Sequence, residues 1–157
     1  NQSLIRTENT SMFITFFAGV LNLNTNRVRF CNAGHPYPLL IAPDGTVSFF
    51  KTADNLPLGV TSDYDYEEQE CYFAPGSQLL LYTDGVSEAQ NERSKFYKID
   101  RLFNLVAGHP RLAPRQMVDK VVGDVKRFVG NAEQSDDLTV MSFRLNARGK
   151  KKTEELL

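Results

Sequence analysis

The stretch LLLYTDGVSEA, Leu79–Ala89, places a carboxylate directly after a buried strand. Its apolar and aromatic beginning is typical of a core β-strand. Asp84 and Gly85 follow, and Asp-Gly is a common turn pair. The residues after Gly85 do not restart an alternating strand, however, which disfavours a two-residue hairpin. Asp84 is therefore either a turn residue or a ligand of something bound where the strand ends.

A second acidic pair, Asp136 and Asp137, comes immediately before the apolar strand LTVMSF. A solvated loop edge is the simplest interpretation, because adjacent like charges repel unless water or a cation lies between them. The alternative is a metal site, since Mg²⁺ and Mn²⁺ prefer oxygen ligands and take few carboxylates from a protein. Two such ions about 4 Å apart can bind a phosphoryl group and activate water. Asp84 and Asp136 are thus candidate ligands of a metal-assisted hydrolase.

The sequence contains two histidines, His35 and His109, whose surroundings differ. His35 lies in the segment NAGHP, 32–36, between two expected strands. A surface turn and a place near the site are equally compatible with that position. His109 lies in a polar turn and is expected to be exposed.

The remaining pattern predicts antiparallel sheet followed by helices. Strands are expected over the ranges 12–21, 27–32, 64–73 and 78–82, and on both sides of the turn Pro43-Asp44-Gly45. Apolar residues at helical spacing then predict helices over 99–107 and 114–129, before a closing strand over 138–143. This order defines an α+β fold in which helices cover an antiparallel sheet.

Length, charge and cysteine content narrow the class of protein. The chain has 157 residues and a net charge of −1, which fits one globular domain with no general attraction for nucleic acid or anionic membranes. It has no apolar run long enough to span a bilayer and no signal-peptide pattern, so a cytoplasmic protein is expected. Cys31 and Cys71 are expected to be reduced thiols. No glycine-rich dinucleotide or P-loop motif is present.

Several segments, taken in order, resemble one known family. They are MFITFFAGVLNLNTNRVRFCNAGHPYPLLI, LPLGV, LLLYTDGVSEA, RLFNLV and QSDDLTVMSFRL. Together they resemble the SpoIIE-type serine phosphatase domain, a bacterial branch of the metal-dependent protein phosphatases (PPM) that are similar to phosphatase 2C. The resemblance implies a sandwich of two antiparallel sheets flanked by helices, with two Mn²⁺ or Mg²⁺ ions at one end.

The resemblance also implies residue roles and a reaction. Asp84 and Asp136 match metal ligands, Asp137 and Gly85 match supporting positions, and His35 falls near the site. No catalytic side chain is implied beyond metal-activated water, which would hydrolyse phosphoserine or phosphothreonine without a phosphoenzyme. The implied substrate is a phosphorylated STAS-type anti-sigma-factor antagonist, in a bacterial partner-switching or stress-response pathway controlled by an upstream sensory or receiver domain.

One departure from the family pattern concerns the earlier acidic motifs. An Asp and an Asp-Gly-His-Gly-like segment ahead of MFIT have no counterpart in this sequence. We therefore expect residues 1–145 to be the C-terminal portion of the domain, incomplete at its N-terminus and short of the metal ligands needed for activity alone. Residues 146–157 are expected to be a disordered charged tail. Exposed sheet edges would favour a homodimer. The rival interpretation is a non-catalytic module that keeps the fold to bind a partner or transmit a signal.

Overall fold

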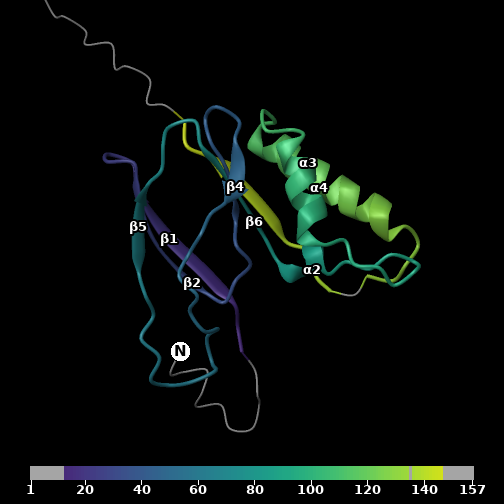
Figure 1. Ribbon diagram of the computed structural model, residues 1–157, viewed down its shortest axis with the longest axis horizontal. Coiled ribbons are helices and arrows are strands. Elements are labelled where there is room, and N and C mark those ends of the chain that lie inside the picture. Colours follow the sequence, from purple (N-terminus) through teal and green to yellow (C-terminus); the bar gives the residue numbers. More distant parts are fainter. Residues whose placement is uncertain (1–12, 135, 147–157) are drawn as a thin grey trace, which may run out of the picture.

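The computed structural model describes residues 13–134 and 136–146, which form two antiparallel sheets and a helical layer (Figure 1). The strand orders are β1-β2-β5 in one sheet and β4-β3-β6-β7 in the other. The strands are β1 (Phe16–Asn22), β2 (Arg27–Ala33), β3 (Leu39–Ile41), β4 (Val47–Phe49), β5 (Gln69–Tyr72), β6 (Gln78–Tyr82) and β7 (Val140–Arg144). The predicted α+β class with antiparallel sheets is confirmed.

The predicted hairpin turns follow from local chemistry. In the β3–β4 turn, the Asp44 carboxylate accepts a hydrogen bond from the Thr46 backbone N–H at 2.8 Å. Gly45 adopts a φ of 94°, which a residue with a side chain rarely tolerates. The strand predicted over 64–73 is shorter, because the Asn55 side chain, rather than a neighbouring strand, binds the Glu67 N–H at 2.9 Å.

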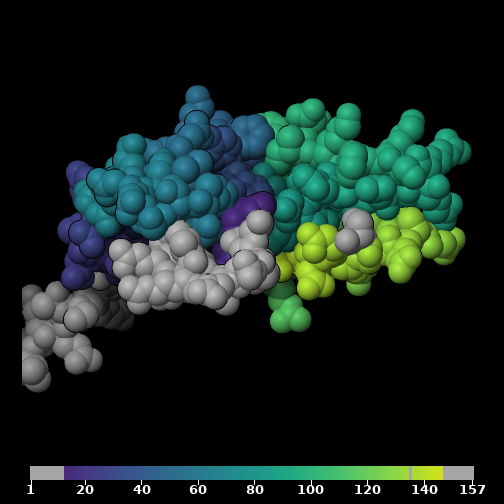
Figure 2. Space-filling view, turned by 90° about the horizontal axis from the view of Figure 1, so that it is seen from below, coloured from purple at the N-terminus to yellow at the C-terminus, as the bar shows by residue number. Residues whose placement is uncertain are grey.

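Two long helices, α3 (Ile99–Ala107) and α4 (Pro114–Val129), cover the second sheet as predicted (Figure 1). Seen from below, their green to yellow-green residues occupy the opposite side of the molecule from the blue and teal strands (Figure 2). The apolar stripe of α4 packs into a core shared with the sheet, and its fully buried members are Met117, Val121 and Val125. At the start of α4 the Gln116 side chain accepts a hydrogen bond from the Ala113 N–H at 3.0 Å. This bond partly replaces the side-chain cap that alanine cannot provide at the N-terminus of the helix.

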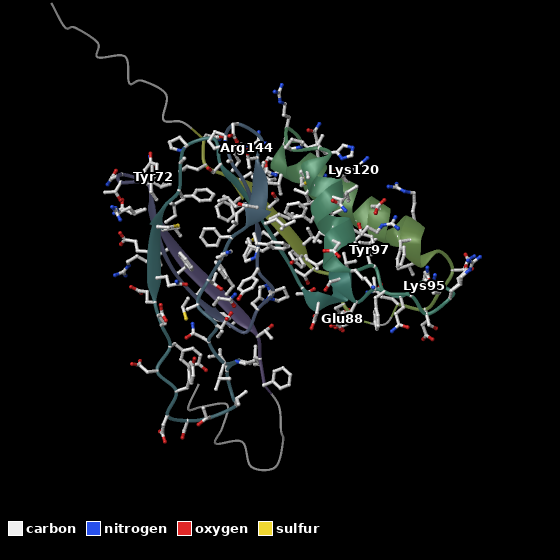
Figure 3. The ribbon with its side chains drawn as sticks, viewed as in Figure 1. Tyr72, Glu88, Lys95, Tyr97, Lys120 and Arg144 are labelled. Carbon is white, nitrogen blue, oxygen red and sulfur yellow. The ribbon has the colours of Figure 1, made fainter. Side chains whose placement is uncertain are left out.

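A polar network ties the segment before α3 to the helices. Tyr97 lies among the side chains of these helices (Figure 3) and donates its hydroxyl to Asp124 at 2.8 Å. Arg101 and Arg127 donate to the same carboxylate at 3.0 and 3.2 Å. Burial alone would raise the pKa of Asp124, but these hydrogen bonds outweigh it and lower the pKa to about 2. The Arg101 guanidinium also stacks over the Tyr97 ring, 5.0 Å from its centroid.

The cysteines and His109 can be compared with their expected environments. Cys31 and Cys71 are free thiols, as expected. His109 differs from its expected exposure, because it is half-buried and its Nδ1 lies 2.9 Å from the Leu105 carbonyl. Within the described part of the chain, no helix is long and apolar enough to cross a lipid bilayer. The tail expected to be disordered lies almost entirely outside the described residues.

Candidate metal centre

The two acidic motifs meet because β6 and β7 are antiparallel neighbours. Their register pairs Tyr82 with Val140, so the chain leaving β6 and the chain entering β7 lie at the same end of the sheet. Asp84 follows that end of β6, and Asp136 precedes that end of β7. Figure 1 shows the short helix α2 (Asp84–Ser87) at this end, beside the yellow-green segment that leads into β7. The sequence could not show this proximity, because the motifs are far apart along the chain.

Asp84 does not sit in a turn but begins the short helix α2 (Asp84–Ser87). Its Oδ1 accepts the N–H of Gly85 at 3.0 Å, while the side chain remains exposed. Asp136 is also exposed, and its Oδ1 accepts the N–H of Asp137 at 2.7 Å. Both carboxylates therefore keep oxygen atoms directed to solvent, where a cation could reach them.

Gly85 allows the two segments to approach. A Cβ atom built on Gly85 would lie 2.3 Å from the Asp137 carbonyl oxygen and 3.6 Å from Leu138 Cα. No side chain fits at such distances, so the glycine is required for contact between the backbones. The supporting role of Gly85 at a metal site stays a prediction, and its close contact with the Asp137 backbone is compatible with that role.

Thr83 joins the same two segments through its side chain. Its hydroxyl donates to the Asp137 carbonyl at 3.3 Å and accepts the Thr139 N–H at 3.2 Å. Thr83 is not among the site residues predicted from the sequence, because a threonine at the end of a strand carries no distinctive pattern. Its position between a core strand and Asp-Gly was the only available signal.

His35 approaches the site from the other sheet, in the loop after β2. Burial lowers the pKa of His35, and the negative charge of Asp84 opposes that shift, which shows that the two side chains are electrostatic neighbours. The loop is held by Asn32, whose side chain accepts the His35 N–H at 2.7 Å and donates to the His35 carbonyl at 2.9 Å. Gly34 adopts a φ of 72° there, and a Cβ atom on it would lie 2.6 Å from Pro57 Cγ.

An open hollow of about 320 Å³ lies next to the acidic residues. Its wall includes Gly85 and Asp136 from the site, together with Lys126 near the end of α4. The remaining lining is largely apolar and includes Ala89, Val125, Val129, Ala132 and Leu138. The wall also includes Glu133, so the site continues into a surface that combines apolar groups with one basic and one further acidic side chain.

The donor set suits a hard divalent cation that keeps part of its water shell. Mg²⁺ commonly takes only one or two carboxylates from a protein and completes its octahedron with water or phosphate oxygen. Asp84 and Asp136 offer this chemistry. Among residues 13–134 and 136–146, no three His, Cys, Asp or Glu side chains are grouped to hold a metal ion. The described residues therefore provide part of the ligand set of a metal ion and not a complete one.

Comparison with known structures defines the class. The fold matches the phosphatase domain of SpoIIE from Bacillus subtilis (Mn presoaked), with a TM-score of 0.69 and 17% identity over 96% of this chain and 65% of that one. The SiaA-PP2C domain of Pseudomonas aeruginosa gives a TM-score of 0.69 and 24% identity over 90% of this chain and 56% of that one. The fold is that of PP2C-like phosphatase domains.

Sequence comparison gives the family. The profile of Stage II sporulation protein E (SpoIIE) matches residues 1–146, and the chain belongs to this family. It is also 25% identical over 144 residues to the phosphoserine phosphatase RsbU of Bacillus subtilis (strain 168), covering 92% of this chain and 42% of RsbU. The chain therefore spans less than half the length of this curated relative. The resemblance stated from the motifs is confirmed.

Proposed function

We propose that this chain is part of a cytoplasmic, metal-dependent protein serine/threonine phosphatase that hydrolyses phosphoserine on a regulatory protein. One observation carries the proposal: the paired ends of β6 and β7 bring two exposed carboxylates, Asp84 and Asp136, to the same end of the sheet. Membership of the SpoIIE family and similarity to a phosphoserine phosphatase support this interpretation of the acidic pair.

Within this proposal, Asp84 and Asp136 bind Mn²⁺ or Mg²⁺, and Asp137 and Gly85 keep the two segments in register. A bound divalent ion supplies positive charge to a phosphoryl group and lowers the pKa of water. The chain's own residues hold and orient the substrate around that centre. Two ions are expected, and further ligands must complete their coordination.

The surroundings of the acidic pair suit a macromolecular substrate. The hollow beside Asp136 is open and largely apolar, so it can contact side chains that flank a phosphoserine. Lys126 can pair with an anionic group of the substrate, although Glu133 in the same wall carries the opposite charge. A phosphorylated STAS-type protein is the substrate we propose, with an upstream sensory or receiver domain as the regulatory partner.

The proposal is tested by phosphate release from a phosphoseryl STAS-type protein. The full-length protein is assayed across Mn²⁺ concentrations beside its Asp84→Asn and Asp136→Asn variants. We expect each variant to lose activity on the order of a hundredfold, because the ion loses a ligand. Asp44→Asn is the control, since the register of β3 with β6 places this exposed turn at the other end of the sheet.

Two results would contradict the proposal. One is activity that persists in both variants or without added metal after chelation. The other is a folded wild-type protein with no activity, which would favour the non-catalytic module that binds a partner. A homodimer stays a separate prediction, which light scattering at high protein concentration tests.

A further inference from the structure

The chain leaves the sheet at Thr83, and its backbone hydrogen bonding changes there. The ladder of β6 and β7 ends with Tyr82 opposite Val140, so Thr83 lies opposite Thr139. The Thr83 N–H still donates to the Thr139 carbonyl at 3.1 Å. In an antiparallel pair the return bond would go from the Thr139 N–H to the Thr83 carbonyl.

That return bond is not formed, and the Thr83 carbonyl instead faces the first turn of α2. It accepts the Val86 N–H at 3.0 Å. The Thr139 N–H donates instead to the Thr83 hydroxyl, at 3.2 Å. The side chain thus replaces a backbone acceptor at the point where a strand becomes a helix.

The same hydroxyl donates its proton to the Asp137 carbonyl at 3.3 Å. A hydroxyl has one donor and two acceptor sites, so one accepted and one donated bond are compatible. Thr83 is the residue before α2, where threonine commonly caps a helix through its side chain. Here that side chain makes no cap hydrogen bond. Its hydroxyl is used between the two segments rather than for its own helix.

We infer that Thr83 is a positioning residue that sets the relative placement of the Asp84 and Asp136 carboxylates. Its bonds reach Asp137 and Thr139, on the segment that carries Asp136, while Asp84 is its immediate neighbour. Gly85 permits the backbones to approach, and Thr83 provides the hydrogen bonds that hold them there. This inference rests on the proposed metal-binding function of the acidic pair.

The inference requires a hydroxyl group rather than the shape of threonine. Thr83→Val keeps the branched shape and the strand preference but removes the donor and the acceptor. Thr83→Ser keeps both. Thr139→Val is the matched control, because the Thr139 side chain is exposed on the adjacent strand end and only its backbone takes part in the bonds described.

The test is calorimetric titration of the full-length protein and its variants with Mn²⁺. We expect Thr83→Val to bind Mn²⁺ about 10–100-fold more weakly, the range typical of residues that orient metal ligands. Thr83→Ser and Thr139→Val should stay close to wild type. A purely structural role would lower thermal stability in Thr83→Val without changing Mn²⁺ affinity, and that result would overturn the inference.

Amide hydrogen exchange without metal separates this inference from the proposed function. Loss of the hydroxyl should speed exchange of the Thr139 amide in Thr83→Val but not in Thr83→Ser. Unchanged exchange of that amide would show that the hydroxyl bond is absent and would overturn the inference whatever the metal result. If wild type binds no Mn²⁺, the proposed function fails, and the positioning role fails with it. If wild type binds Mn²⁺ and Thr83→Val binds equally well, only the inference fails.

Discussion

Replacing Gly85 by alanine tests the close contact that brings the acidic segments together. The added Cβ would lie 2.3 Å from the Asp137 carbonyl oxygen and 3.0 Å from the carbonyl carbon, whereas ordinary contact begins at 3.4 Å. The obstacle is backbone, so the segment before β7 must move away from α2. Such overpacking costs about 1–3 kcal/mol.

Helix preference partly offsets this cost, because alanine is favoured over glycine in a helix by about 1 kcal/mol. The net destabilisation is then roughly 0–2 kcal/mol, the difference between the two effects. For a chain of 157 residues this lowers the thermal midpoint by up to about 8 °C. Calorimetric or circular-dichroism melting measures the shift, and Mn²⁺ titration of the same variant should show weaker binding.

Gly123→Ala in α4 is the matched control for the same substitution. A Cβ atom there would meet only the Arg127 guanidinium nitrogen at 3.7 Å, the end of a flexible side chain. We expect stabilisation by about 0.5–1 kcal/mol, because alanine reduces the conformational freedom of the unfolded chain. If Gly85→Ala is as stable as Gly123→Ala, the segments do not approach as described and the reasoning is wrong.

Three further substitutions test the surrounding structure. Asp124→Asn should cost about 1–2 kcal/mol at neutral pH, allowing for partly exposed arginine partners. Folding lowers the Asp124 pKa to about 2, so the carboxylate stabilises the fold above about pH 4 and this stabilisation is lost as the pH falls toward 2. The free energy of unfolding in urea should therefore decrease less steeply on acidification in the variant than in the wild type. Gly34→Ala should lower the free energy of unfolding by about 2–4 kcal/mol, because the backbone φ is 72° and the added Cβ would collide with Pro57. Equal melting curves for the variant and the wild type would contradict this. Tyr82→Phe should lower the free energy of unfolding, measured in urea, by about 1 kcal/mol, because it removes the 3.0 Å hydrogen bond from the buried Tyr82 hydroxyl to the Tyr37 carbonyl. An unchanged free energy of unfolding would show that this bond is dispensable.

Periodic features of the fold were predictable from the sequence. The apolar stripe of α4 and the turn at Pro43-Asp44-Gly45 each have a local cause, and the structure confirms both. The closing strand expected over 138–143 is present as β7, where Val140 packs toward the helices while Phe143 faces the other sheet. These features depend on neighbouring residues alone, which is why the sequence revealed them.

The geometry of the candidate site depends on contacts between distant segments, which no local pattern reports. Asp84 and Asp136 were selected as candidates, but their proximity follows from the pairing of β6 with β7. The Thr83 hydroxyl accepts the Thr139 N–H, while the Thr83 carbonyl accepts the Val86 N–H in α2. The network of Asp124 likewise joins it to Tyr97 and Arg101, which lie 27 and 23 positions away along the chain.

The most direct test of the central claim is whether Asp84 and Asp136 bind the same ion. Mn²⁺ affinity is measured by titration for the full-length protein, for Asp84→Asn, for Asp136→Asn and for the double variant. Shared coordination predicts weaker binding in each single variant and a double variant that loses clearly less than the product of the two single effects. A shared metal centre would be contradicted if the loss of Mn²⁺ affinity in the double variant equals the product of the two single losses to within about 0.5 kcal/mol. Unchanged Mn²⁺ affinity in either single variant would also contradict it.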